Sequence, residues 1–175
     1  AASFSIDATT GQVKLLTPAD FEVKSSYSIT VNAKDASHTT TKAVTINVTD
    51  VNEAPSITSA ATGTVAENAA TSTVVYTATA TDPESDTLSY SLTGTDAASF
   101  TINTAGAVKL ITPADFETKS SYSVTVNAMD ATHTTTQAVT INATNVNEAP
   151  TAANFTSAGL TSSTAVTGAS VGTLA

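Results

Sequence analysis

The chain has 175 residues, and its 15 acidic side chains outnumber six lysines, with no arginine, for a formal net charge of −9. Nucleic-acid binding is not expected, because contacts to phosphates need clusters of Lys and Arg. The absence of cysteine excludes disulfides and thiolate metal sites, and no apolar run approaches the roughly 20 residues of a membrane-spanning helix.

The sequence repeats itself with a period of about 95 residues. Residues 1–55 align with residues 97–150, most aligned pairs are identical, and DVNEAP at 50–55 returns as NVNEAP. This register predicts three segments in chain order. They are the latter part of one repeat at 1–55, a complete repeat at 56–150 and the opening strands of a third at 151–175.

Apolar and polar side chains alternate in both copies, which is the pattern of half-buried β-strands. In the first copy, Tyr27, Ile29 and Val31 fall on one face of YSITVNA. In the complete repeat we expect strands at 73–80, 88–94, 100–103, 107–111, 122–128 and 138–144. About seven short antiparallel strands per repeat predict an all-β fold, an immunoglobulin-like β-sandwich.

The acidic residues gather in short motifs at expected loops and strand ends. These motifs contain Asp20 and Glu22 in ADFE, Asp35 in NAKDAS, Asp50 and Glu53 in DVNEAP, Glu67 in AEN, Asp82, Glu84 and Asp86 in DPESD, Asp115 and Glu117 in the second ADFE, Asp130 in NAMDAT, and Glu148 in NVNEAP. Acids at loop tips can simply keep a Thr-rich surface soluble. Crowded carboxylates also suit Ca²⁺, which takes 6 to 8 oxygen ligands, and we favour calcium.

These motifs, in this order around a β-sandwich repeat, resemble the calcium-binding motifs of cadherin repeats, in particular the cadherin-like repeats of large bacterial surface adhesins. The resemblance implies tandem Greek-key sandwiches with Ca²⁺ between consecutive repeats. For the first junction it implies the ligands Asp20, Glu22, Asp50, Asn52, Glu53, Asp82, Glu84 and Asp130, with Asp86 close enough to contribute. For the second junction it implies Glu67, Asp115, Glu117, Asn147 and Glu148, and Asp35 is the counterpart of Asp130 in the first copy. The linker is one residue shorter than the family pattern, which leaves the number of ions per junction open.

The function that follows is a calcium-stiffened structural repeat of an extracellular or cell-surface adhesin, partnered by neighbouring repeats of its own chain. The alternative is a segment of an extracellular filament, in which other copies complete the first repeat head-to-tail by strand complementation. An enzyme is not expected, because no nucleophile turn, zinc-protease helix or phosphate-binding glycine loop is present. His38 and His133, each three residues after an aspartate, are expected to be loop residues.

Overall fold

A computed structural model describes residues 3–149, 155–157 and 172–174 of the chain. It divides into two compact units, residues 1–144 and 145–175. The second unit contains the antiparallel pair β14 (Phe155–Ser157) and β15 (Gly172–Leu174). Most of the expected third repeat, 151–175, lies outside the described residues.

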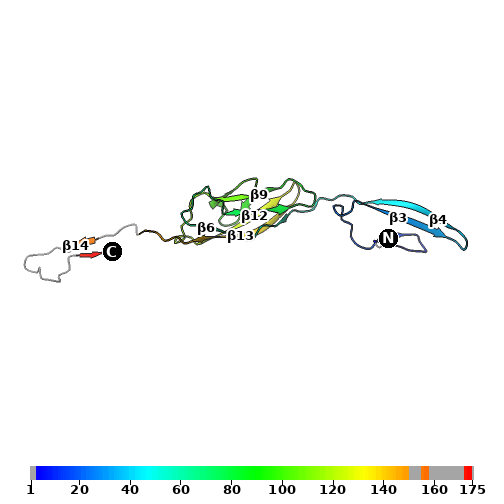
Figure 1. Ribbon diagram of the computed structural model, residues 1–175, viewed down its shortest axis with the longest axis horizontal. Helices are drawn as coiled ribbons and strands as arrows, with labels where there is room; N and C mark the ends of the chain where they lie inside the picture. Colours follow the sequence, from blue (N-terminus) through cyan, green and yellow to red (C-terminus); the bar gives the residue numbers. More distant parts are fainter. Residues whose placement is uncertain (1–2, 150–154, 158–171, 175) are drawn as a thin grey trace, which may run out of the picture. The chain divides into compact units, whose positions relative to one another are not determined.

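Residues 56–144 fold as a β-sandwich of short strands (Figure 1). One sheet has the order β6 (Thr62–Ala66), β13 (Thr134–Thr144), β12 (Ser121–Met129) and β9 (Ser89–Thr93). The other has the order β10 (Phe100–Ile102), β11 (Ala107–Leu110) and β7 (Tyr76–Thr77), and a 3₁₀ turn at Ala97–Ser99 precedes β10. A separate pair joins β5 (Ser56–Ile57) to β8 (Ala80–Thr81). The all-β Greek-key prediction is confirmed.

Two details of the strand prediction are wrong. The expected strand at 73–80 is divided between β7 and β8, which belong to different sheets. β6 was not predicted and pairs with β13 in parallel, so the repeat is not purely antiparallel. One reason why β6 was not predicted is Gly63, where a Cβ would lie 2.7 Å from the carbonyl oxygen of Val75. A glycine that permits this close approach also interrupts the alternating pattern by which strands are recognised.

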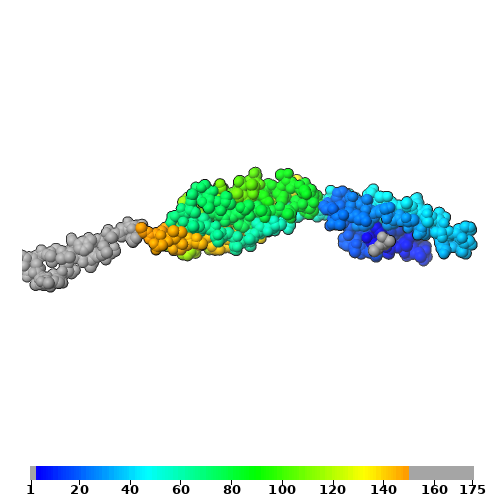
Figure 2. Space-filling model, in the orientation of Figure 1, coloured from blue at the N-terminus to red at the C-terminus, as the bar shows by residue number. Residues whose placement is uncertain are grey.

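The alternating residues of β12 and β13 build the core. Val124, Val126, Val139 and Ile141 are at most 1% exposed, as the period-two pattern predicts. Tyr122 packs edge-to-face on Phe100 with ring centroids 5.3 Å apart, which joins the two sheets. On the face drawn in Figure 2, the atoms of the complete repeat form a continuous surface.

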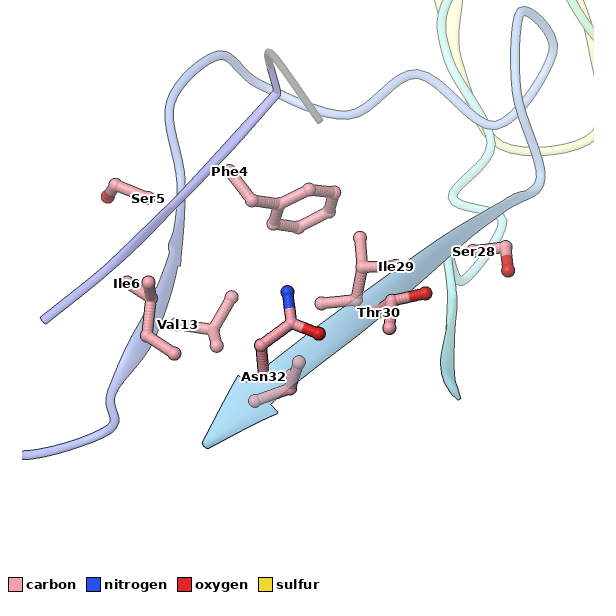
Figure 3. Close-up of a pocket in the computed structure, with 9 residues that line it drawn as sticks. Phe4, Ser5, Ile6, Val13, Ser28, Ile29, Thr30 and Asn32 are labelled. Carbon is pink, nitrogen blue, oxygen red and sulfur yellow. The ribbon is translucent and has the colours of Figure 1, made fainter. Parts of the chain in front are cut away.

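The described residues of the first copy, 3–55, form two hairpins, β1 (Phe4–Ile6) with β2 (Val13–Leu15) and β3 (Ser26–Lys34) with β4 (Thr39–Asn47). Its apolar side chains are half-buried or exposed, and some of them line a groove of about 440 Å³ (Figure 3). Phe4, Ile6, Val13 and Ile29 line this groove. In the complete repeat, the edge of β12 that corresponds to this part of β3 is paired with β9.

Candidate metal site at the linker

The loops that carry the predicted ligands are shaped by their own aspartates. Asp20 Oδ1 accepts the amide N–H of Val23 at 2.9 Å, and Asp82 Oδ1 accepts that of Asp86 at 3.1 Å. Such local bonds close tight turns. Ser85, between Asp82 and Asp86, adopts a positive φ of 63° to complete its turn.

These turns place three carboxylates from three parts of the chain together. Glu22 of the first repeat, Asp50 of the linker and Glu84 of the complete repeat have oxygens within 4.8 Å of one another. We call these three residues the linker cluster. They line a hollow of about 440 Å³ together with Phe21, Ser25 and Pro83. The cluster combines an upstream loop, the linker and a downstream loop, as the sequence predicts for the first junction.

Two carboxylate oxygens at this place have no hydrogen-bond donor. Asp82 Oδ2 and Glu84 Oε1 are buried and unpartnered. Burying an ionised oxygen without a donor is costly, and buried polar atoms are normally satisfied. A cation would satisfy both atoms, and a set made only of carboxylate oxygens suits a hard ion such as Ca²⁺. The residues at the linker cluster therefore fit the expected metal.

Glu53 lies close to other carboxylates at this junction. Its backbone N–H donates to Glu84 Oε2 at 3.3 Å. A hydrogen bond between the two carboxyl groups, with desolvation and repulsion from Glu84, Glu22 and Asp20, raises the pKa of Glu53 to about 7. The same hydrogen bond lowers the pKa of Glu84. Without a cation, one proton shared by two carboxylates relieves their repulsion.

Asn52 of the linker is hydrogen-bonded to Asp130 of the complete repeat. Asn52 Nδ2 donates to Asp130 Oδ2 at 3.0 Å. Asp130 Oδ1 accepts the backbone N–H groups of Thr132 and His133, both at 2.5 Å. The His133 bond is the main reason why the pKa of Asp130 falls to about 2. Both oxygens of Asp130 therefore have protein donors.

A second group of carboxylates lies at the other end of the complete repeat. Glu67, Asp115 and Glu117 have oxygens within 4.8 Å of one another. Glu67 is only 3% exposed, and its Oε2 accepts the N–H of Phe116 at 2.8 Å. Asn147 and Glu148, predicted for the same junction, are exposed residues of the second compact unit.

Asp35, Asp86 and Asp20 are among the predicted ligands that lie outside these two carboxylate groups. Asp35 is exposed and closes its own loop by accepting the N–H groups of Ser37 and His38. The carboxylate of Asp86 is exposed and belongs to neither group. Asp20 also belongs to neither group, although it is close enough to contribute to the raised pKa of Glu53.

The sequence did not predict that Thr132 and His133 contact the linker residue Asn52. Both side chains lie within 2.9 Å of the linker amide Asn52 Nδ2. The available signal was the repeated motif DASH at 35–38 and DATH at 130–133. Asp96, which stood apart from the acidic motifs, has a structural partner, because Lys119 Nζ donates to its Oδ1 at 2.5 Å.

Comparison with known proteins identifies the domain type. The family model of the cadherin domain matches residues 61–144. Human protocadherin gamma-C4 is 33% identical over 84% of this chain, and human protocadherin Fat 1 is 36% identical over 73%. The chain spans 17% and 3% of the lengths of these two relatives.

Solved structures agree with the fold. Mouse cadherin-23 EC22-24 matches with a TM-score of 0.62 and 27% identity, over 82% of this chain and 50% of that one. Extracellular cadherin domains 3-6 of protocadherin gamma B2 match with a TM-score of 0.67 and 20% identity, over 93% of this chain and 43% of that one. Across the described residues, no helix has the length and apolar character needed to cross a membrane.

Proposed function

Because residues 61–144 form a cadherin domain, we propose that this chain is a calcium-stiffened structural segment of an extracellular adhesin. Members of this family are structural adhesion proteins. In this proposal the repeats space an adhesive part of the parent protein, and calcium fixes the angle between consecutive repeats. Bacterial origin stays a prediction. Head-to-tail filament assembly also stays one, and the comparisons lend it no support.

One observation carries the calcium proposal. Glu84 Oε1, a buried oxygen without a donor, belongs to the linker cluster, where carboxylates of both repeats and the linker converge, and Asp82 Oδ2, a second such oxygen, belongs to the same DPESD motif. Ordinary solubilising acids lie exposed and need no partner. Buried, unpartnered oxygens beside two further carboxylates are instead what a cation site lacks when its charge is uncompensated.

The proposed ligands at this junction come from each side of the joint. Glu22 contributes from the first repeat, Asp50 from the linker, and Asp82 with Glu84 from the complete repeat. A bound Ca²⁺ supplies the positive charge that these groups lack and allows Glu53 to release its proton. Because the ligands come from two repeats and the linker between them, binding restrains relative motion of the repeats, which is otherwise the default between domains.

The group Glu67, Asp115 and Glu117 is proposed as the upstream half of the next joint, with Asn147 and Glu148 as its linker ligands. At that linker Asn145 replaces Asp50, which removes one negative charge. Because Ca²⁺ affinity depends on the number of charged ligands, we expect the second joint to bind calcium more weakly than the first.

Calorimetric titration with Ca²⁺, after EDTA treatment and dialysis, tests the proposal. We expect saturable binding with a dissociation constant of about 10⁻⁴ to 10⁻³ M, the range of extracellular calcium modules. Mg²⁺ at the same concentrations should bind more weakly, because it demands a strict octahedral shell and dehydrates reluctantly. Absence of saturable heat with Ca²⁺ would refute the proposed site.

A further inference from the structure

One edge of β3 has no partner strand among the described residues, because its sheet contains only β3 and β4. In the complete repeat the corresponding edge of β12 is paired with β9, and Asn127 lies opposite Ser91. Residues 30–33 of β3 and residues 125–128 of β12 have the same sequence, TVNA. The backbone of β3 therefore offers the edge that β9 occupies on β12.

A groove of about 440 Å³ lies beside this edge, and we call it the β3 groove (Figure 3). Three of the apolar side chains that line it are half-buried, and they are Phe4, Val13 and Ile29. Phe4 and Ile29 point toward one another across the groove in Figure 3. The groove thus combines an apolar lining with an unpaired strand edge.

In the complete repeat, β9 covers the matching place. The counterparts of the three half-buried side chains are at most 5% exposed, and they are Phe100, Val108 and Val124. Tyr90 and Leu92 of β9 pack against the core to which these counterparts belong. The β3 groove therefore corresponds to the space that two side chains of β9 occupy in the complete repeat.

The polar face of β9 is contacted as well. Asn127 Nδ2 donates to Ser91 Oγ at 3.1 Å and to Thr93 Oγ1 at 3.3 Å. Asn127 is 9% exposed, whereas Asn32, at the same position of β3, is an exposed residue that lines the β3 groove. Asn32 thus offers its amide where Asn127 contacts the hydroxyl groups of β9.

The segment that follows β9 supplies an ion pair. Asp96 accepts Lys119 Nζ at 2.5 Å and the backbone N–H of Ser123 at 2.7 Å. Lys24 is the counterpart of Lys119, and each ammonium group lies over a tyrosine ring, 4.7 Å and 5.2 Å from the ring centroid. The ion pairs found among the described residues do not include Lys24. Lys24 therefore has the position of Lys119 without its acidic partner.

We propose that the β3 groove is a binding site for an extended peptide segment of another chain, which adds to β3 as an antiparallel strand. The segment has the chemistry of residues 88–96, LSYSLTGTD. Its Tyr and Leu enter the groove, its hydroxyl groups contact Asn32, and its final Asp pairs with Lys24. A second copy of this chain is not the expected partner, because its β9 is already paired within its own repeat.

Fluorescence polarisation in EDTA, with a labelled synthetic peptide of residues 87–97, tests the inference. We expect saturable binding of one peptide per chain and no binding of a scrambled peptide of the same composition. Tyr90→Ser or Leu92→Ser in the peptide should weaken binding about tenfold or more, because each change removes an apolar side chain from the groove. These changes leave the folded chain itself unaltered.

The ion pair is tested by changing both partners. Asp96→Asn in the peptide should weaken binding about threefold, the usual effect of losing a partly exposed ion pair. The same peptide should bind the protein variant Lys24→Met as well as the unchanged peptide does, because the pair is already lost. An equal effect of Asp96→Asn on both proteins would contradict the assignment of Lys24 and overturn the proposed register.

Disulfide formation measures the register directly, because the chain has no cysteine of its own. Asn32→Cys in the protein should form a disulfide with a peptide that carries Ser91→Cys, since opposed residues of antiparallel strands lie about 4.5–5.5 Å apart. A peptide with Ser89→Cys, two residues away on the same face, should not react. Asn127→Cys is the matched control in the protein, because β9 already covers that position and neither peptide should react.

Three outcomes would overturn the inference. They are absence of saturable binding, equal binding of the scrambled peptide, and equal disulfide formation by the two cysteine peptides. Sedimentation velocity of the chain alone should show a monomer, and a dimer that excludes the peptide would assign the β3 groove to a second copy instead. Because all these measurements are made in EDTA, their failure leaves the proposed calcium site standing, and failure of that site leaves the β3 groove standing.

Discussion

The carboxylates of the predicted ligands divide into those with protein donors and those with an oxygen that lacks one. Asp130 and Asp35 are satisfied by backbone N–H groups of their own loops. Asp82 and Glu84 each retain one buried oxygen that nothing satisfies. Sequence alone places all four in acidic motifs. It does not distinguish them, because whether a donor reaches a given oxygen depends on the folded turn.

Substitution of Glu84 tests this distinction at the residue scale. Glu84→Gln should weaken calcium binding about tenfold or more, because it removes a charged ligand. In EDTA the same variant should flatten the dependence of the melting temperature on pH, because it removes the carboxylate whose hydrogen bond raises the pKa of Glu53. Titration calorimetry and thermal unfolding measure the two effects.

Asp86→Asn is the control for Glu84→Gln, because it removes a charge from the same DPESD motif outside the linker cluster. Its calcium affinity should remain within about twofold of wild type. Equal losses in the two variants would mean that total loop charge governs the affinity, and the linker cluster would lose its special role.

The raised pKa of Glu53 predicts that the stability of the calcium-free protein depends on pH. Its pKa is about 7 in the folded chain against an ordinary value of 4.5, chiefly because of its hydrogen bond to Glu84. A raised pKa means that the folded state holds the proton more tightly than the unfolded state does. The contribution of Glu53 to stability is therefore complete below about pH 4.5 and is lost as the pH rises through about 7.

In EDTA, the melting temperature should accordingly fall between about pH 5 and pH 8. Glu53→Gln should reduce this fall, because it removes the group that must lose a proton. Saturating calcium should reduce it as well, since the ion replaces the proton as the compensating charge. A melting curve in EDTA with the same pH slope in wild type and Glu53→Gln would contradict this account.

The hairpins β3–β4 and β12–β13 show how the rest of a repeat changes the burial of nearly identical strands. Their sequences are nearly the same, and their registers correspond residue by residue. Ile141 is fully buried, whereas its counterpart Ile46 is only half-buried. Both hairpins are strands by their alternating pattern, but β12–β13 packs against a three-stranded second sheet, whereas β3–β4 faces only the two-stranded sheet β1–β2 among the described residues.

Matched substitutions measure that difference. Ile141→Ala should destabilise the complete repeat by about 2–5 kcal/mol, the usual cost of truncating a buried aliphatic side chain. Ile46→Ala, which removes the same atoms from a half-buried site, should cost less than half as much. Urea unfolding followed by hydrogen exchange of the two hairpins compares them within one molecule. Equal costs would show that the first hairpin is as well packed as the second.

The long strands were predictable from sequence, and the short ones were not. β12 and β13 carry an uninterrupted period-two pattern, which is visible without any structure. β7 and β8 consist of two residues each, and a pattern cannot assign such short pieces to separate sheets. β6 was missed because its partner β13 is far away in sequence and its own pattern contains Gly63. The site motifs were predictable by resemblance, whereas the Asn52 contacts to Thr132 and His133 required the fold.

At the scale of the whole molecule, each junction is proposed to be a joint built from an upstream loop, the linker and a downstream loop. At the first junction the linker provides Asp50 to the linker cluster, and Asn52 is hydrogen-bonded to Asp130. Cadherin domains repeated in this way become a stiff array only if their junctions are restrained, because relative motion is otherwise the default. In the proposed function, the stiffness of the array therefore depends on the bound ion more than on any single repeat.

Thermal unfolding of the same chain in millimolar Ca²⁺ and in EDTA tests this central claim most directly. An ion that binds only the folded joint stabilises it by about 0.4 to 1.4 kcal/mol at 1 to 10 times the dissociation constant, the ratio that millimolar Ca²⁺ gives for the expected affinity. We therefore expect the melting temperature to rise by several degrees in calcium, and Glu84→Gln to abolish most of that rise. Identical melting temperatures of the wild-type chain in calcium and in EDTA would contradict the account.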